Sequence, residues 1–291
     1  MVDVAEQVRG IDFTRPREKP SLVLMKRIAT QMRRDIVTMI AEAGSGHPGG
    51  SLSSVDIVAA LYFHCMRHDP RHPDWAERDR FVLSKGHCCP VLYSVLSLCG
   101  YFDRQLLTTL RKLGSILQGH PDSKRCPGVE VSSGSLGQGL SFALGMALAG
   151  KLDGKSYRVF ALLGDGENQE GQVWEAAMAA AHYNAHNLVV ALDNNELQID
   201  GPIREVMDVH PIDEKWKAFG WRVVGPVDGH NFDSIFAAFE EALTPSSRPT
   251  ICIFRTVKGK GVSFMEDQVE WHGKAPNKQE LARALADLAE K

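Results

Sequence analysis

The second half of the chain alternates short apolar runs with helical patterns, and this alternation constrains the fold more than any other feature. The runs are RVFALL (158–163), LVVALD (188–193), WRVVG (221–225) and TICIFRTV (250–257). Helical patterns at about 136–150, 169–184, 211–219 and 232–243 lie between or beside them. Strands that are apolar on both faces and separated by helices are typical of a parallel sheet covered on both sides. The sequence therefore predicts an α/β fold, a doubly wound and mostly parallel sheet with helices on both faces.

The first half is expected to add helices and one short strand. Apolar residues recur at helical spacing from Leu22 to Ile40 behind Ser21, a plausible N-cap. We also expect helices at about 54–66, 88–99 and 103–112, a strand at 81–84 and a long loop at 113–134. Residues 1–20 show little apolar periodicity and are expected to form an extended arm. The tail from Asn277 predicts a capped amphipathic helix. The predicted organisation is an arm, 1–20, followed by one domain, 21–291.

Composition excludes several classes of protein. The 291 residues include 33 Lys and Arg against 36 Asp and Glu, a net charge of −3, whereas a nucleic-acid binder should show a basic excess. No apolar run approaches the roughly 18 residues of a membrane helix, and the first residues lack the apolar core of a secretory signal. The six cysteines form no CxxC pair, which argues against a zinc site. We expect a cytoplasmic protein that binds neither nucleic acid nor membranes.

Polar residues follow two neighbouring strands of the predicted sheet. Gly164, Asp165 and Gly166 end the strand at 158–163, and Asp193-Asn194-Asn195 ends the next one. Ligands of doubly wound sheets gather at the carboxyl ends of strands, so Asp165 and Asn195 should converge there on one ion. Mg²⁺ usually binds through few protein oxygens plus the phosphates of a ligand. The chain contains neither a GxGxxG that opens a helix after a strand nor GxxxxGK[ST], which argues against a dinucleotide site and excludes a P-loop.

This spacing of GDG and NN resembles the diphosphate-binding motif of thiamine diphosphate (ThDP) enzymes. Seven stretches narrow the resemblance to the transketolase family and span about 21–280 in the family's order. They are SGHPGG (45–50), DRFVLSKGH (79–87), QGHPD (118–122), GVEVSSGSLGQG (128–139), GDGENQEGQVWEA (164–176), DNNELQIDG (193–201) and WHGKAP (271–276). The resemblance implies the ThDP-binding domain that holds the diphosphate, known as the PP domain.

The resemblance also implies a set of site residues. Asp165, Asn195 and the backbone carbonyl of Leu197 match the ligands of Mg²⁺, for which Ca²⁺ or Mn²⁺ can substitute. Further positions match the cofactor contacts, namely His87, Gly134, Leu136, Gly164, Gly166, Asn195, Ile199 and His272. Glu170 matches a glutamate at the subunit interface near the cofactor, although a solvated carboxylate in the first turn of a helix explains it as well.

Five of the eleven histidines adjoin a glycine in a loop, which gives an imidazole access to a ligand. The resemblance assigns His47, His120 and His272 to the substrate and its hydroxyl protons, and we expect His230 to be structural. Both protonation states of these histidines should be accessible near pH 7. Lys85 is expected to lie beside the diphosphate or, equally, to be solvated.

The chain is short for the activity that the motifs imply. Transketolases are roughly twice this length, and their second half carries the pyrimidine-binding domain and most contacts to the sugar phosphate. The resemblance therefore implies the N-terminal subunit of a split transketolase, inactive alone and assembled as α₂β₂ with a C-terminal partner subunit. Its reaction would transfer a two-carbon ketol unit from a ketose or ketose phosphate to an aldose. A deoxyxylulose-phosphate-synthase-like protein, the α-subunit of a 2-oxoacid dehydrogenase and a non-catalytic regulatory or scaffold subunit remain as alternatives.

Overall fold

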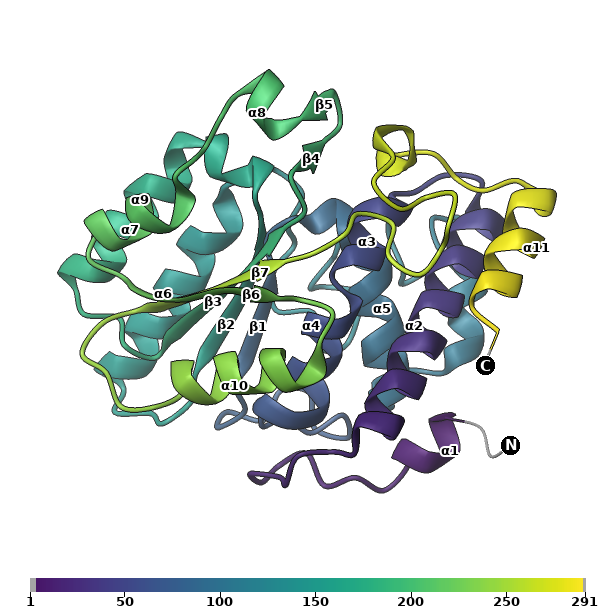
Figure 1. Ribbon diagram of the computed structural model, residues 1–291. Coiled ribbons are helices and arrows are strands. Elements are labelled where there is room, and N and C mark those ends of the chain that lie inside the picture. Colours follow the sequence, from purple (N-terminus) through teal and green to yellow (C-terminus); the bar gives the residue numbers. More distant parts are fainter. Residues whose placement is uncertain (1–3, 290–291) are drawn as a thin grey trace.

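A five-stranded parallel sheet forms the centre of the computed structural model, which describes residues 4–289 (Figure 1). The strand order is β1 (Arg80–Leu83), β2 (Val159–Gly164), β3 (Leu188–Asn194), β7 (Thr250–Arg255) and β6 (Arg222–Asp228). Every neighbouring pair runs parallel. The predicted α/β class is confirmed, and each predicted strand is present with its ends shifted by a few residues.

Helices cover both faces of this sheet, because successive strand residues point to opposite sides. In β2, Val159, Ala161 and Leu163 pack into one core cluster, while Phe160 and Leu162 pack into the other. The first cluster lies under α6 (Gln138–Leu152), α7 (Gly171–His182) and α9 (Ile212–Ala218). The second lies under α2 (Leu22–Ala43), α4 (Val55–Ala60), α5 (Cys89–Cys99) and α10 (Phe232–Ala242) (Figure 1).

Several helix boundaries differ from the predicted ones. The helix expected at 54–66 is present as α4 followed by a π-helical turn (Leu61–Cys65), and a separate short helix, α3 (Pro48–Ser53), precedes it. Pro48 occupies the first turn of α3, a position where its missing N–H costs nothing. The helix expected at 103–112 is a 3₁₀ helix (Arg104–Thr109). The predicted cap of α11 (Lys278–Asp287) is confirmed, since Asn277 and Glu280 form a capping box.

The remaining elements are short and lie close to the carboxyl ends of the strands. Strands β4 (Leu197–Gln198) and β5 (Gly201–Pro202) form a small antiparallel hairpin, followed by α8 (Ile203–Val206). Single 3₁₀ turns span Gly86–Cys88, Gly166–Gln169 and Val269–His272. The sequence did not predict these elements, because each is too short to show a period.

The N-terminal segment packs against the domain, which differs from the extended arm that we expected. Residues Val4–Val8 form α1, and Val4, Val8 and Phe13 are buried in the second core cluster. The ring of Phe13 stacks on that of His68, with centroids 4.4 Å apart. Arg17 donates a hydrogen bond of 2.6 Å to the carbonyl of Met66. Two apolar residues one helical turn apart are too few for a periodic signal, which explains the difference.

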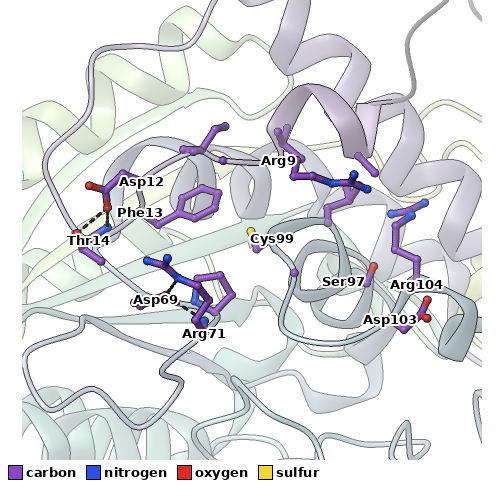
Figure 2. A pocket seen from close by; sticks show the side chains of 17 residues that line it. Arg9, Asp12, Phe13, Thr14, Asp69, Arg71, Ser97, Cys99, Asp103 and Arg104 are labelled. Carbon is purple, nitrogen blue, oxygen red and sulfur yellow. Dashed lines mark hydrogen bonds and ion pairs between the residues drawn. The ribbon is translucent and has the colours of Figure 1, made fainter.

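A cavity of about 630 Å³ lies between this segment and the C-terminal end of α5 (Figure 2). Its polar side chains pair locally. Asp12 accepts hydrogen bonds from the amide and hydroxyl of Thr14, and Asp69 pairs with Arg71. These contacts belong to the packing of the segment. Among the described helices, none is long and apolar enough to span a membrane.

Candidate active site

A cavity of about 410 Å³ opens at the carboxyl ends of β2 and β3. It contains every residue that the sequence predicted for the site except His120. The lining includes His47, His87, Gly134, Leu136, Gly164, Asp165, Gly166, Glu170, Asn195, Leu197, Ile199 and His272. His120 lies beside the cavity against Gly134, where an added Cβ would come within 3.0 Å of the imidazole. The absence of a side chain at Gly134 therefore makes room for His120.

The predicted metal ligands come together in this cavity. Asp165 and Asn195 follow adjacent parallel strands, in which Gly164 lies opposite Asp193. The Asp165 carboxylate accepts hydrogen bonds from the backbone amides of Gly166 (2.8 Å) and Glu196 (2.5 Å). Burial, followed by repulsion from Asp193, raises the pKa of Asp165 to about 7. A buried carboxylate in such surroundings favours a neighbouring cation.

The donor atoms fit a hard divalent ion. Asp165 offers a carboxylate, Asn195 an amide oxygen and Leu197 a backbone carbonyl, all of which are ligands of the kind that Mg²⁺ takes together with phosphate oxygens. The side-chain Oε1 of Gln198, in the same cavity, is buried without a hydrogen-bond partner in the described part of the chain. Within residues 4–289 no group of three or more His, Cys, Asp or Glu could hold a metal ion. Metal binding here therefore depends on additional oxygens, as a diphosphate would supply.

Three histidines from separate segments form a cluster on one side of the cavity. The ring centroid of His47 lies 5.1 Å from that of His87 and 5.6 Å from that of His272, and the last two rings stack at 5.3 Å. Burial is the main cause that lowers their pKa values, to about 4 for His47, to about 3 for His272 and well below 6.5 for His87. For these three histidines, the expectation that both protonation states are accessible near pH 7 was therefore wrong. Burial keeps these imidazoles neutral near pH 7. The sequence could not show this burial, which is why the prediction failed.

Lys258, which the sequence analysis missed, reaches into the same cavity. This lysine is 2% exposed, and its Nζ donates hydrogen bonds to the carbonyl of Leu197 (2.9 Å) and to Nδ1 of His272 (3.0 Å). Burial lowers the pKa of Lys258. The available sequence signal was its position just beyond β7, at the same edge of the sheet as Asp165.

Lys85 is buried, so the solvated alternative was wrong. Its Nζ forms an ion pair with Asp193 and donates a hydrogen bond to the carbonyl of Gly50 (3.1 Å). Asp193 also accepts hydrogen bonds from Ser53 (2.6 Å) and Ser54 (2.9 Å). Burial alone would raise the pKa of Asp193, but Lys85 and the hydroxyls of Ser53 and Thr256 outweigh it and lower the pKa to about 2. Lys85 thereby supplies a fixed positive charge at the cavity wall.

Glu167, a second residue missed from sequence, connects the loops beneath the cavity. Its carboxylate is 2% exposed and accepts hydrogen bonds from the hydroxyl of Ser84 (2.5 Å) and the amides of Gly137 (2.8 Å) and Gly164 (3.2 Å). Ser84 follows β1, Gly137 precedes α6 and Gly164 ends β2. One side chain therefore fixes the end of β1, the start of α6 and the end of β2 relative to one another.

The outer rim of the cavity is exposed. Ile199 is 60% exposed and Leu136 is 36% exposed, and both line the cavity. Glu170 is also exposed, at the N-terminus of α7, where its side chain makes no capping hydrogen bond. An open rim that carries apolar side chains is suited to contact with another protein surface.

Comparison with known proteins identifies the family. Residues 24–289 match the model of the transketolase thiamine diphosphate binding domain. The chain belongs to the transketolase family. Its sheet, with a cavity at the carboxyl ends of the strands, is thus that of a ThDP-binding domain.

The transketolase relatives include proteins of similar length. The 6-deoxy-6-sulfo-D-fructose transketolase subunit SqwG of Clostridium sp. (strain MSTE9) is 44% identical over 89% of this chain and 94% of the relative. An apulose-4-phosphate transketolase subunit of Phocaeicola vulgatus is 42% identical over 89% of this chain and 92% of the relative. The transketolase structure from Campylobacter jejuni has a TM-score of 0.87 and 30% identity over 92% of this chain, but only 43% of that longer chain. This chain is therefore a transketolase component of the N-terminal, split-subunit type.

Proposed function

We propose that this transketolase component anchors ThDP and Mg²⁺ for an enzyme completed by a C-terminal partner subunit, in an α₂β₂ assembly. The observation that carries the proposal is that one cavity, at the ends of β2 and β3, contains an acidic residue, further oxygen ligands and a cluster of histidines. The exposed rim formed by Leu136 and Ile199 supports a partner that covers the cavity.

In this proposal Asp165, Asn195 and the carbonyl of Leu197 hold Mg²⁺. The diphosphate lies against Gly164 and Gly166 with His87 and His272 near it, while Gly134, Leu136 and Ile199 contact the rings and Glu170 contacts the partner. ThDP supplies the carbanion chemistry when bound, and the protein anchors and orients it. Lys85 and Lys258 add positive charge beside the diphosphate, as their places in the cavity lining support.

We assign the handling of substrate hydroxyl protons to His47, His120 and His272. Their lowered pKa values keep the imidazoles neutral, so that each can accept a hydrogen bond from a substrate hydroxyl. Nδ1 of His47 is buried and has no hydrogen-bond partner among the described residues, so it is available to a ligand.

The proposed substrates are a ketose or ketose phosphate as donor and an aldose as acceptor, between which a two-carbon unit is transferred. Two relatives are named for a sulfonated sugar and a sugar phosphate, which supports a substrate with an anionic end group. The six cysteines are free thiols, which supports a reducing compartment such as the cytoplasm.

The test is the affinity of ThDP and Mg²⁺, measured by calorimetry on the chain mixed with its partner. Asp165→Ala should weaken binding at least about tenfold, because it removes the only charged ligand of the set. Asp213→Ala is the matched control, since Asp213 is a surface aspartate whose ion pair with Lys217 lies on α9. Wild-type affinity in Asp165→Ala would overturn the metal assignment. Absence of ketol transfer by a complex that binds ThDP would favour another ThDP activity or a regulatory role.

A further inference from the structure

The carboxylate of Asp56 lies at the centre of a buried network outside the cofactor cavity. Asp56 belongs to α4 and is 4% exposed. It accepts two hydrogen bonds from the guanidinium of Arg33 on α2, at 3.1 and 2.5 Å, and it lies 2.7 Å from Nδ1 of His230. A buried carboxylate of this kind needs such partners, because its charge is otherwise costly.

Both partners of Asp56 also bind the backbone around Lys258. Nε2 of His230 accepts a hydrogen bond from the amide of Val257 at 2.8 Å, and Nε of Arg33 donates one to the carbonyl of Lys260 at 3.0 Å. Because Nε2 is an acceptor, the proton of this neutral imidazole is on Nδ1, where it is donated to Asp56. The network therefore holds the chain on both sides of Lys258.

The opposite side of this segment is held by α3. The amide of Gly259 donates a hydrogen bond to the carbonyl of Gly49 at 3.0 Å. A side chain at Gly49 could not be accommodated, because its Cβ would lie 2.9 Å from the carbonyl oxygen of Trp271 and 3.0 Å from Cγ of Lys258. The backbone of 257–260 is thus fixed between α3 and the Asp56 network, and the side chain of Lys258 lines the cavity.

We propose that Arg33, Asp56 and His230 are positioning residues for Lys258. They fix the backbone at 257–260 so that Nζ of Lys258 stays between the carbonyl of Leu197 and His272. Without them the lysine would have to order a long, flexible side chain from a mobile backbone, at a larger cost in conformational entropy. The placement of Lys258 follows from the structure alone, whereas its effect on ThDP rests on the proposed function. His230 therefore has a structural role, as expected from the sequence, and through this role it positions Lys258 in the cavity.

The first test measures the placement of Lys258 without any cofactor, by amine labelling and mass spectrometry. His230→Ala should increase the labelling rate of Lys258 several-fold, while Lys85, a buried lysine outside the network, serves as internal control. His230→Gln should restore protection, because its amide can accept from Val257 and donate to Asp56. Unchanged labelling of Lys258 in His230→Ala, or an equal increase at Lys85, would overturn the proposal.

The second test is a double-mutant cycle on ThDP and Mg²⁺ affinity in the complex with the partner. His230→Ala should weaken binding in the wild-type background and have no further effect in Lys258→Met, because residues that act through one group are not additive. The same loss in both backgrounds would show that His230 acts elsewhere and would contradict the proposal. A wild-type complex that binds no ThDP would instead contradict the proposed function, and the labelling test would still decide the placement of Lys258.

Discussion

At the residue scale, two glycines of α6 differ in what an added side chain would meet. A Cβ at Gly139 would lie 2.4 Å from the hydroxyl oxygen of Ser84 and 2.6 Å from its Cα, whereas a Cβ at Gly145 would meet nothing within 4 Å. We predict that Gly139→Ala destabilises the chain by about 1–3 kcal/mol, because the backbone at Ser84, just after β1, must move. Gly145→Ala should stabilise it by about 0.5–1 kcal/mol through helix propensity.

Urea unfolding of both variants measures these opposite signs on one helix. Because Ser84 also donates to Glu167, Gly139→Ala should additionally weaken ThDP binding in the complex. Equal effects of the two substitutions on stability would contradict the close packing of Gly139 against Ser84.

A second prediction at this scale concerns pH and His68. Burial lowers the pKa of His68 from 6.5 to about 4, in a site where Nε2 lies 3.0 Å from the carbonyl of Tyr62. The unfolded chain thus binds a proton at higher pH than the folded chain. The resulting stability is present above 6.5 and is lost as pH falls from 6.5 towards 4, by an amount on the order of 3 kcal/mol.

The measurement is the free energy of unfolding at about pH 7 and about pH 5 in the wild type and in His68→Gln. The decrease towards pH 5 should be smaller in the variant, which has no imidazole at this position. An identical decrease in both proteins would assign the pH dependence to other groups.

At the scale of elements, the N-terminal segment is expected to contribute to stability although it precedes the periodic part of the chain. Phe13 is 4% exposed and contacts the rings of Phe63 and His68. Phe13→Ala should cost about 3 kcal/mol, as large-to-small substitutions in cores do. Leu152→Ala is the control, because Leu152 is 88% exposed. Thermal and urea unfolding check this, and a loss no greater than that of the control would mean that the segment is not docked.

The elements that the sequence predicted correctly are those with long periodic signals. The strands β2, β3 and β7 are apolar on both faces, and α2 and α11 carry caps at Ser21 and Asn277. The elements that it missed, such as α1 and the β4–β5 hairpin, are a few residues long and depend on contacts with distant parts of the chain. Such short elements are stabilised by tertiary contacts, which leave no pattern in the local sequence.

The same division applies to the candidate site. Asp165 and Asn195 could be placed because strand ends meet at one edge of a parallel sheet. The burial of Lys85 and Lys258 could not be predicted, because their partners are remote in sequence. Lys85 pairs with Asp193, and Lys258 donates a hydrogen bond to the carbonyl of Leu197. The neutral state of the histidines likewise follows from desolvation by three separate segments.

At the scale of the whole molecule, exposed apolar side chains surround the cavity. Ile199 and Met207 are each 60% exposed, and the carbonyl of Met207 accepts a hydrogen bond from Gln169 of the cavity lining. We predict that Ile199→Asp and Met207→Asp each weaken association with the partner by at least about tenfold, because a buried charge opposes docking.

Sedimentation of the mixed subunits measures this association. Leu152→Asp is the control, since Leu152 is also apolar and even more exposed (88%) but lies at the far end of α6, about 20 Å along the helix from Gln138. Weakening by Leu152→Asp to the same extent would place the interface elsewhere.

The three hydrogen bonds to Glu167 have a consequence for how such an enzyme can diversify. They connect the loops at the floor of the cavity within this chain alone. The rim, by contrast, is left for another surface to finish. A division of this kind allows sugar preference to change through the covering polypeptide while the anchor is retained. The two relatives that are 44% and 42% identical to this chain are named for a sulfonated sugar and for a sugar phosphate.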